Sequence, residues 1–168
     1  MPEPCVLAGV FPGQSPAVVQ AAARLAAALG QQLVCAYVNP ARYLVAEAAD
    51  GTVTSAPVDP DFLDDAGASF PAQLASALER ELAGLPWRPL LLAGDPAQAL
   101  GRCANTLSAG LIVVGTHGDS HASLREILNH SVATQLARKQ LRPVLVVPTH
   151  HGHDGQDGLG GRPGLGRL

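Results

Sequence analysis

Short, continuously apolar runs alternate with amphipathic stretches along the first 149 residues of the chain. The runs near 5–10, 33–38, 90–93, 111–114 and 143–147 predict strands that are buried on both faces. Between them, apolar side chains recur at helical spacing, which predicts helices over about 16–29, 70–82 and 96–109, and helical structure over 124–140. The pattern leaves two alternatives for 124–140, one continuous helix or a break near Asn129 and His130. This alternation favours an α/β protein in which helices cover both faces of an open, five-stranded parallel sheet.

Residues suited to helix ends stand at the expected boundaries. Ser15 and Asp95 can cap a helix N-terminus, and each is followed by a proline, which is favoured at the first helical position. Gly30 follows the first helix, where a left-handed residue is commonly needed. By contrast, residues 39–68 have no steady period and contain several prolines and glycines, so we predict a long connection there.

The chain is expected to form one domain over residues 1–149, because 168 residues are a usual length for a single compact unit. Nearly half of the residues (47%) are hydrophobic, which is enough to form a buried core. Residues 150–168 carry seven of the eighteen glycines and few apolar side chains, so we predict a disordered, Gly/His-rich tail.

Charge and hydropathy argue against several classes of partner. The formal net charge is −3, so neither nucleic acid nor an anionic membrane is an expected partner. No apolar run approaches the ~20 residues that span a bilayer, and residues 1–15 lack a signal-peptide pattern, so we expect a cytoplasmic protein. The three cysteines form no C-x-x-C pair and the histidines have no recognisable ligand spacing, so neither a disulfide nor a metal site is expected.

Two glycine-containing loops follow predicted strands and are candidates for ligand binding. One spans residues 9–15 and the other spans residues 115–118. In an open parallel sheet the ligand crevice lies at the carboxyl ends of the strands, and glycine lets backbone amides approach a phosphate. Taken alone, however, a Gly-x-x-Gly spacing is more often explained by a tight turn.

Six segments, in the right order, resemble the universal stress protein family. They are residues 6–10, 94–97, 109–118, 124–128, 131–132 and 142–148. The resemblance covers about residues 4–149 and implies a three-layer sandwich of the Rossmann-like, adenine nucleotide alpha hydrolase type, with strand order 3-2-1-4-5. It also implies a protein that is often dimeric, and whose ATP-binding members carry the motif Gly-x2-Gly-x9-Gly-Ser/Thr.

The chain departs from that motif in three places. Gly115 and Gly118 match its first half, but eleven residues follow where nine are usual. His130 then occupies the position of the third glycine, whereas Ser131 is retained. At the end of the first strand, Phe11 aligns with an aspartate that nucleotide-binding relatives place near the adenine or ribose. We expect these changes to weaken ATP binding, although His130 could donate to a phosphate and Phe11 could stack on a base.

The resemblance therefore implies a candidate nucleotide site between the loops at 9–13 and 115–131. Its candidate residues are Gly9, Val10, Phe11, Val38, Gly115, His117, Gly118, His130, Ser131 and Val132. For His117 and Ser131 a structural role, in a turn and as a helix cap, is the simpler interpretation.

We therefore expect a stress-response module that binds ATP weakly or not at all and acts through dimerisation and contacts with an unidentified protein. It is not expected to be an enzyme, because the chain lacks a nucleophile elbow and a Gly-Lys-Ser/Thr phosphate loop. The alternative is a protein that binds ATP or AMP with Mg²⁺, whose nucleotide orders loop 115–131 and is slowly hydrolysed. A homodimer is expected at the last strand, because its apolar edge contains neither lysine nor an internal proline. The edge residues are Val144, Leu145, Val146 and Val147.

Overall fold

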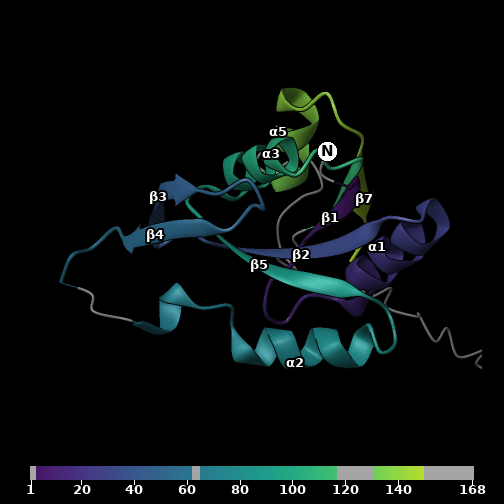
Figure 1. Ribbon diagram of the computed structural model, residues 1–168, viewed down its shortest axis with the longest axis horizontal. Helices are drawn as coiled ribbons and strands as arrows, with labels where there is room; N and C mark the ends of the chain where they lie inside the picture. Colours follow the sequence, from purple (N-terminus) through teal and green to yellow (C-terminus); the bar gives the residue numbers. More distant parts are fainter. Residues whose placement is uncertain (1–2, 62–64, 117–130, 150–168) are drawn as a thin grey trace, which may run out of the picture.

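The computed structural model describes residues 3–61, 65–116 and 131–149, with a five-stranded parallel sheet at its centre (Figure 1). The strands are β1 (Cys5–Gly9), β2 (Gln32–Asn39), β5 (Trp87–Ala93), β6 (Leu111–Gly115) and β7 (Val144–Val147). They lie in the order β5-β2-β1-β6-β7, and every adjacent pair is parallel. This order is 3-2-1-4-5 when only the strands of this sheet are numbered along the chain, so the predicted fold is confirmed.

Helices cover both faces of the sheet. On one face lie α1 (Pro16–Leu29) and α2 (Ala72–Glu81), and on the other lie α3 (Pro96–Thr106) and α5 (Val132–Lys139). Alternate strand residues therefore enter different cores: Val6 and Ala8 pack with α1 and α2, whereas Cys5 and Leu7 pack with α3 and α5. All four side chains are buried, which explains why the strand is continuously apolar.

The helix caps that the sequence predicts are present. The Ser15 hydroxyl accepts a hydrogen bond from the Ala17 amide at 3.3 Å, and the Asp95 carboxylate accepts one from the Gln98 amide at 2.9 Å. Gly30 ends α1 in the left-handed conformation, with φ 63°. An N-terminal side-chain cap such as Ser15 or Asp95 stabilises a helix by about 1 kcal/mol.

The segment 39–68 contains more secondary structure than its sequence predicted. It includes an antiparallel hairpin formed by β3 (Arg42–Glu47) and β4 (Val53–Pro57), and a 3₁₀ helix, η1 (Asp65–Ala68). The expectation of an irregular connection is therefore wrong. The strand signal was hidden because a β-bulge between Leu44 and Ala46 interrupts the two-residue alternation of β3.

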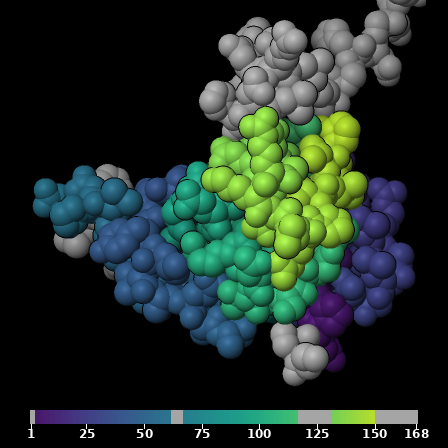
Figure 2. Space-filling model, turned by 90° about the horizontal axis from the view of Figure 1, so that it is seen from above, coloured from purple at the N-terminus to yellow at the C-terminus, as the bar shows by residue number. Residues whose placement is uncertain are grey.

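The turn of the β3–β4 hairpin packs closely against β5 and the end of α3. Gly51 has φ 83°, and a Cβ added there would lie 3.0 Å from Leu90 and 3.1 Å from Leu107. On the adjoining strand, Glu47 forms a 2.9 Å ion pair with Arg102 of α3. The hairpin lies at one end of the molecule and α1 at the other, as the view onto α3 and α5 shows (Figure 2).

Two element boundaries differ by three residues from the sequence prediction. β5 begins at Trp87 and contains Pro89, whereas the apolar pattern predicted a start at residue 90. Because β5 is an edge strand, a proline is tolerated there without the loss of a ladder hydrogen bond. The helix that follows β5, α3, ends at Thr106 instead of near residue 109.

Of the two alternatives for residues 124–140, one continuous helix is excluded. Ser131 has extended dihedral angles, φ −70° and ψ 146°, so α5 starts at Val132 and no helix runs unbroken from 124 to 140. Residues 117–130 and the predicted tail, 150–168, lie outside the described residues. Within the part of the chain that the structure describes, no helix is long and apolar enough to cross a membrane.

Candidate functional site

A cavity of about 370 Å³ lies at the carboxyl ends of β1, β2 and β6. The strand order reverses here, because the chain runs from β1 to β2 and β5 on one side and then crosses to β6 on the other. The ligand crevice of an open parallel sheet is expected at such a switch point. The cavity brings together six of the ten predicted nucleotide-binding residues: Gly9, Val10, Phe11, Val38, Gly115 and Val132.

Eight further residues line this cavity that sequence reasoning did not name as site residues. They are Pro12, Gln14, Ala36, Tyr37, Pro40, Pro96, Leu100 and Val114. The prolines at 40 and 96 follow the ends of β2 and β5, so turn signals after predicted strands could have found them. Leu100 belongs to the apolar stripe of α3, and nothing local distinguishes it from an ordinary core residue.

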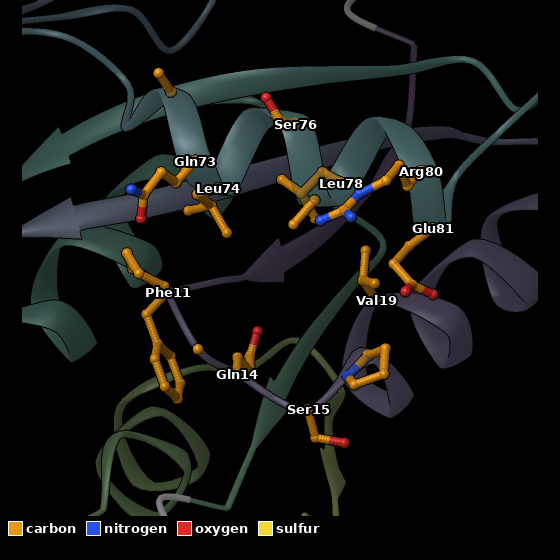
Figure 3. A pocket seen from close by; sticks show the side chains of 15 residues that line it. Phe11, Gln14, Ser15, Val19, Gln73, Leu74, Ser76, Leu78, Arg80 and Glu81 are labelled. Atoms are coloured by element: carbon orange, nitrogen blue, oxygen red, sulfur yellow. The ribbon is translucent and has the colours of Figure 1, made fainter.

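The turn after β1 shapes one wall of the cavity. The Val10 amide donates to the Ala36 carbonyl at 2.9 Å, and the Val10 side chain is buried in the core beside α1. The Gln14 amide nitrogen Nε2 donates to the Gly9 carbonyl at 3.3 Å and so closes the turn. The Phe11 ring points away from α2 (Figure 3). Of these side chains, Phe11 and Gln14 are the ones that a ligand could contact.

The cavity wall is chiefly apolar. Val38 and Val132 pack against the core beneath α3 and α5, and the aromatic rings of Phe11 and Tyr37 contribute further apolar surface. None of the described residues that line the cavity has a charged side chain. The described wall therefore suits a flat, weakly polar group such as a nucleoside base, and it supplies no cation to a phosphate.

Gly115 has a structural role that does not require a ligand. A Cβ added at this position would lie 2.8 Å from the Val18 side chain and 3.0 Å from the Thr149 side chain. Real Cβ atoms do not approach other atoms so closely, so any larger residue would push β6 away from α1 or from the end of β7. Close packing of the sheet explains this glycine as well as phosphate binding does.

Ser131 acts as a helix cap. Its hydroxyl accepts a hydrogen bond from the Thr134 amide at 3.2 Å and lies 3.0 Å from the Thr134 hydroxyl. Ser131 is not part of the cavity wall, although the neighbouring Val132 is. The structural interpretation of Ser131 therefore accounts for its contacts.

Three predicted site residues, His117, Gly118 and His130, lie outside the described residues. Their part in a phosphate-binding loop stays a prediction. Within residues 3–61, 65–116 and 131–149, no cluster of His, Cys, Asp and Glu could hold a metal ion.

The three cysteines are free, buried thiols. Burial raises the pKa of Cys35 to about 12 and, with a smaller contribution from Glu47, raises the pKa of Cys103 to about 12. Burial also raises the pKa of Cys5. All three are therefore protonated at neutral pH, and protonated thiols are neither nucleophiles nor metal ligands.

The two edges of the sheet differ in their exposure to another chain. At the β5 edge, Pro89 removes one amide donor, and the β3–β4 hairpin contacts the strand. At the β7 edge, Leu145 and Val146 are each 38% exposed, and the strand has no proline. Within residues 3–61, 65–116 and 131–149, β7 is therefore the edge more accessible to strand pairing.

An open parallel sheet with helices on both faces and an apolar cavity at its switch point defines a Rossmann-like α/β domain. The chain belongs to the universal stress protein family, which it matches over residues 5–148. No curated protein matches the chain significantly.

Solved structures of universal stress proteins share the fold. One, a universal stress protein in complex with cAMP, is 26% identical, with a TM-score of 0.59 over 89% of this chain and 100% of that one. A member of the family from Burkholderia pseudomallei is 29% identical, with a TM-score of 0.54 over 86% of this chain and 95% of that one. A third, from Archaeoglobus fulgidus in complex with dAMP, is 18% identical, with a TM-score of 0.55 over 87% and 98% of the two chains, and supports the fold alone.

Proposed function

We propose that this universal stress protein is a binding module and not an enzyme, and that its cavity takes the nucleoside part of a small adenine nucleotide while binding ATP only weakly. The protein, with or without the bound nucleotide, would act through a homodimer and through contacts with an unidentified protein. The observation that carries the proposal is the cavity at the switch point, which is apolar and has no charged side chain among its described lining residues.

The chemistry of the cavity favours a ligand with few charges. A triphosphate requires cations or a metal ion to balance its charge, whereas a single phosphate can be held by backbone amides alone. The similar protein that was solved with cAMP carries a ligand with one phosphate. A nucleotide of the AMP or cAMP type is therefore the better candidate for this wall.

Phe11 also weakens the binding of the sugar and base of ATP. Its ring offers a stacking surface but accepts no hydrogen bond, and a lost bond to a buried polar group costs about 1–3 kcal/mol. That cost corresponds to a loss in affinity of roughly five- to 150-fold. We therefore infer weak ATP binding from Phe11 and from the apolar wall together.

The second candidate function is a nucleotide switch in which ATP or AMP, with Mg²⁺, orders loop 115–131 and is slowly hydrolysed. The cavity itself and the nucleotide-bound neighbour favour it. When ATP is the ligand, this switch differs from the first proposal in one measurable respect, because ATP with Mg²⁺ then binds at least as tightly as AMP.

Thermal melts with AMP, cAMP or ATP–Mg²⁺ test both proposals, since a ligand specific to the native state raises the melting temperature by mass action. Val132→Phe places a ring in the cavity wall, and Val45→Phe makes the same change on the exposed hairpin strand. We expect AMP or cAMP to raise the melting temperature of the wild type and of Val45→Phe but not of Val132→Phe. A larger rise with ATP–Mg²⁺ would favour the switch, and no rise with any nucleotide would leave only the interaction module.

A further inference from the structure

A second, larger hollow lies on the other side of the 11–14 turn. It has a volume of about 610 Å³ and runs between α2 and the segment from Phe11 to Val19 (Figure 3). Phe11, Pro12 and Gln14 line both hollows, so a single turn separates them. We call this hollow the α2 groove. It is distinct from the candidate nucleotide cavity and lies at the opposite face of the sheet.

The floor of the α2 groove is apolar because α2 packs on the sheet through one stripe only. Leu74 and Leu78 are buried in this stripe, and Val19 of α1 lies beside them. The next positions around α2 carry the small residues Ala72 and Ala77, which leave open the space that larger side chains would fill. A ligand with an apolar body could lie on this floor without displacing a side chain.

One cation stands over this floor. In Figure 3 the Arg80 side chain runs back along α2 beside Leu78, over the groove. Arg80 has no hydrogen-bond or ion-pair partner among the described residues. The other charged residue of the groove, Glu81, accepts a hydrogen bond from Gln20 at 2.9 Å and closes the end where α1 meets α2. The groove therefore combines an apolar floor with the unpaired guanidinium of Arg80, and the carboxylate of Glu81 lies at its closed end.

We propose that the α2 groove binds a small anionic amphiphile, a free carboxylic acid with a compact apolar body. The carboxylate would pair with the Arg80 guanidinium, whose planar donors match a carboxylate in geometry. The apolar body would lie above the buried Leu74 and Leu78 and contact the accessible surface of Ala72, Ala77 and Pro12. The ten residues of α2 are about 15 Å long, which limits the ligand to small-molecule size.

The dimensions and charge disfavour larger partners. A stable protein–protein contact covers about 800 Å² on each side, which exceeds a groove the length of one short helix. A membrane surface attracts clusters of basic residues, and Arg80 is the one basic side chain in the described groove. A small dissolved carboxylic acid matches the size of the groove and can pair with Arg80, which is its one basic side chain among the described residues.

The probe is 8-anilinonaphthalene-1-sulfonate, an anion with an apolar body whose fluorescence rises on binding, with octanoate as the competing carboxylate. We expect saturable binding of the dye that octanoate displaces. Arg80→Gln should weaken the binding of both by about three- to ten-fold, whereas Arg138→Gln, an equal change of charge on α5, should leave it unchanged. Ala77→Phe, which fills the groove from α2, should abolish it.

Other results would overturn the proposal. Equal dye binding by the wild type and Arg80→Gln would remove the role of the arginine. Loss of dye binding in Val132→Phe would show that the dye occupies the nucleotide cavity, and loss in Val45→Glu would show that it covers the hairpin. Co-flotation with phosphatidylglycerol vesicles, without displacement of the dye by octanoate, would indicate a membrane surface. A circular-dichroism melt of each variant verifies that it is folded.

Discussion

The Val18 side chain of α1 lies so close to Gly115, at the end of β6, that a Cβ atom added to the glycine would sit 2.8 Å from it. This contact joins a helix on one face of the sheet to the strand that flanks the candidate nucleotide cavity. The glycine that begins the candidate phosphate motif is thus also needed for the helix to pack on the sheet.

Gly115→Ala should therefore destabilise the protein in the absence of any nucleotide. Overpacking of this kind costs about 1–3 kcal/mol. Gly110→Ala is the matched control, because the added Cβ would meet only the flexible end of Gln31, at 3.2 Å. Urea unfolding of both variants measures the difference. Equal stability of the two would show that the contact with Val18 is relieved at no cost.

The ion pair between Glu47 and Arg102 should fasten the hairpin to α3. The Glu47 side chain is only 11% exposed, so Arg102→Met would leave a largely buried carboxylate without its partner. We expect a loss of about 1–2 kcal/mol, discounted because Arg102 is 35% exposed. The double variant Glu47→Gln with Arg102→Met should lose less than Arg102→Met alone. Hydrogen exchange of the β3 and β4 amides measures the effect, and unchanged exchange would contradict this role.

The buried thiols should make stability depend on pH in the alkaline range. The pKa of Cys35 and of Cys103 rises from 9.0 to about 12 on folding, so the folded chain holds these protons while the unfolded chain releases them. Stability from this source is complete below pH 9 and is lost as the pH rises from 9 toward 12. Denaturant melts across this range should show a falling free energy of unfolding. Cys35→Ala should reduce the slope, and an unchanged slope would contradict the assignment.

The exposed edge at β7 predicts a homodimer. Val146→Lys places a charge on this edge and should convert the dimer to a monomer, because an inserted lysine discourages strand pairing. Val45→Lys, on the exposed hairpin, is the control. Multi-angle light scattering at micromolar concentration distinguishes the two states. A wild type that is already monomeric, or a dimer that survives Val146→Lys, would exclude this interface.

Much of the fold could be predicted because burial on both faces leaves a continuous apolar signal in each strand. The caps at Ser15 and Asp95 were predictable for a similar reason, since a single side chain performs the function locally. The β3–β4 hairpin could not be predicted from the sequence. Its bulge near Val45 breaks the alternation of apolar and polar residues, and its turn is held by contacts with distant residues.

The candidate site was predictable only where local chemistry marks it. Gly9 and Gly115 begin the two glycine-containing loops predicted to follow strands, and they end β1 and β6 at the cavity. Leu100 and Tyr37 reach the same cavity through the sheet order and the packing of α3, and neither is evident from their neighbours in the sequence. The α2 groove depends on what lies opposite Ala77 in space, which no sequence pattern records.

Isothermal titration calorimetry with AMP and with ATP–Mg²⁺, on protein freed of nucleotide, tests the central claim most directly. We predict a dissociation constant for ATP–Mg²⁺ weaker than about 1 µM and weaker than that for AMP, because the cavity wall around Phe11 offers no charge to a triphosphate. Submicromolar binding of ATP–Mg²⁺, or ATP that stays bound through purification, would contradict the claim and favour the nucleotide switch.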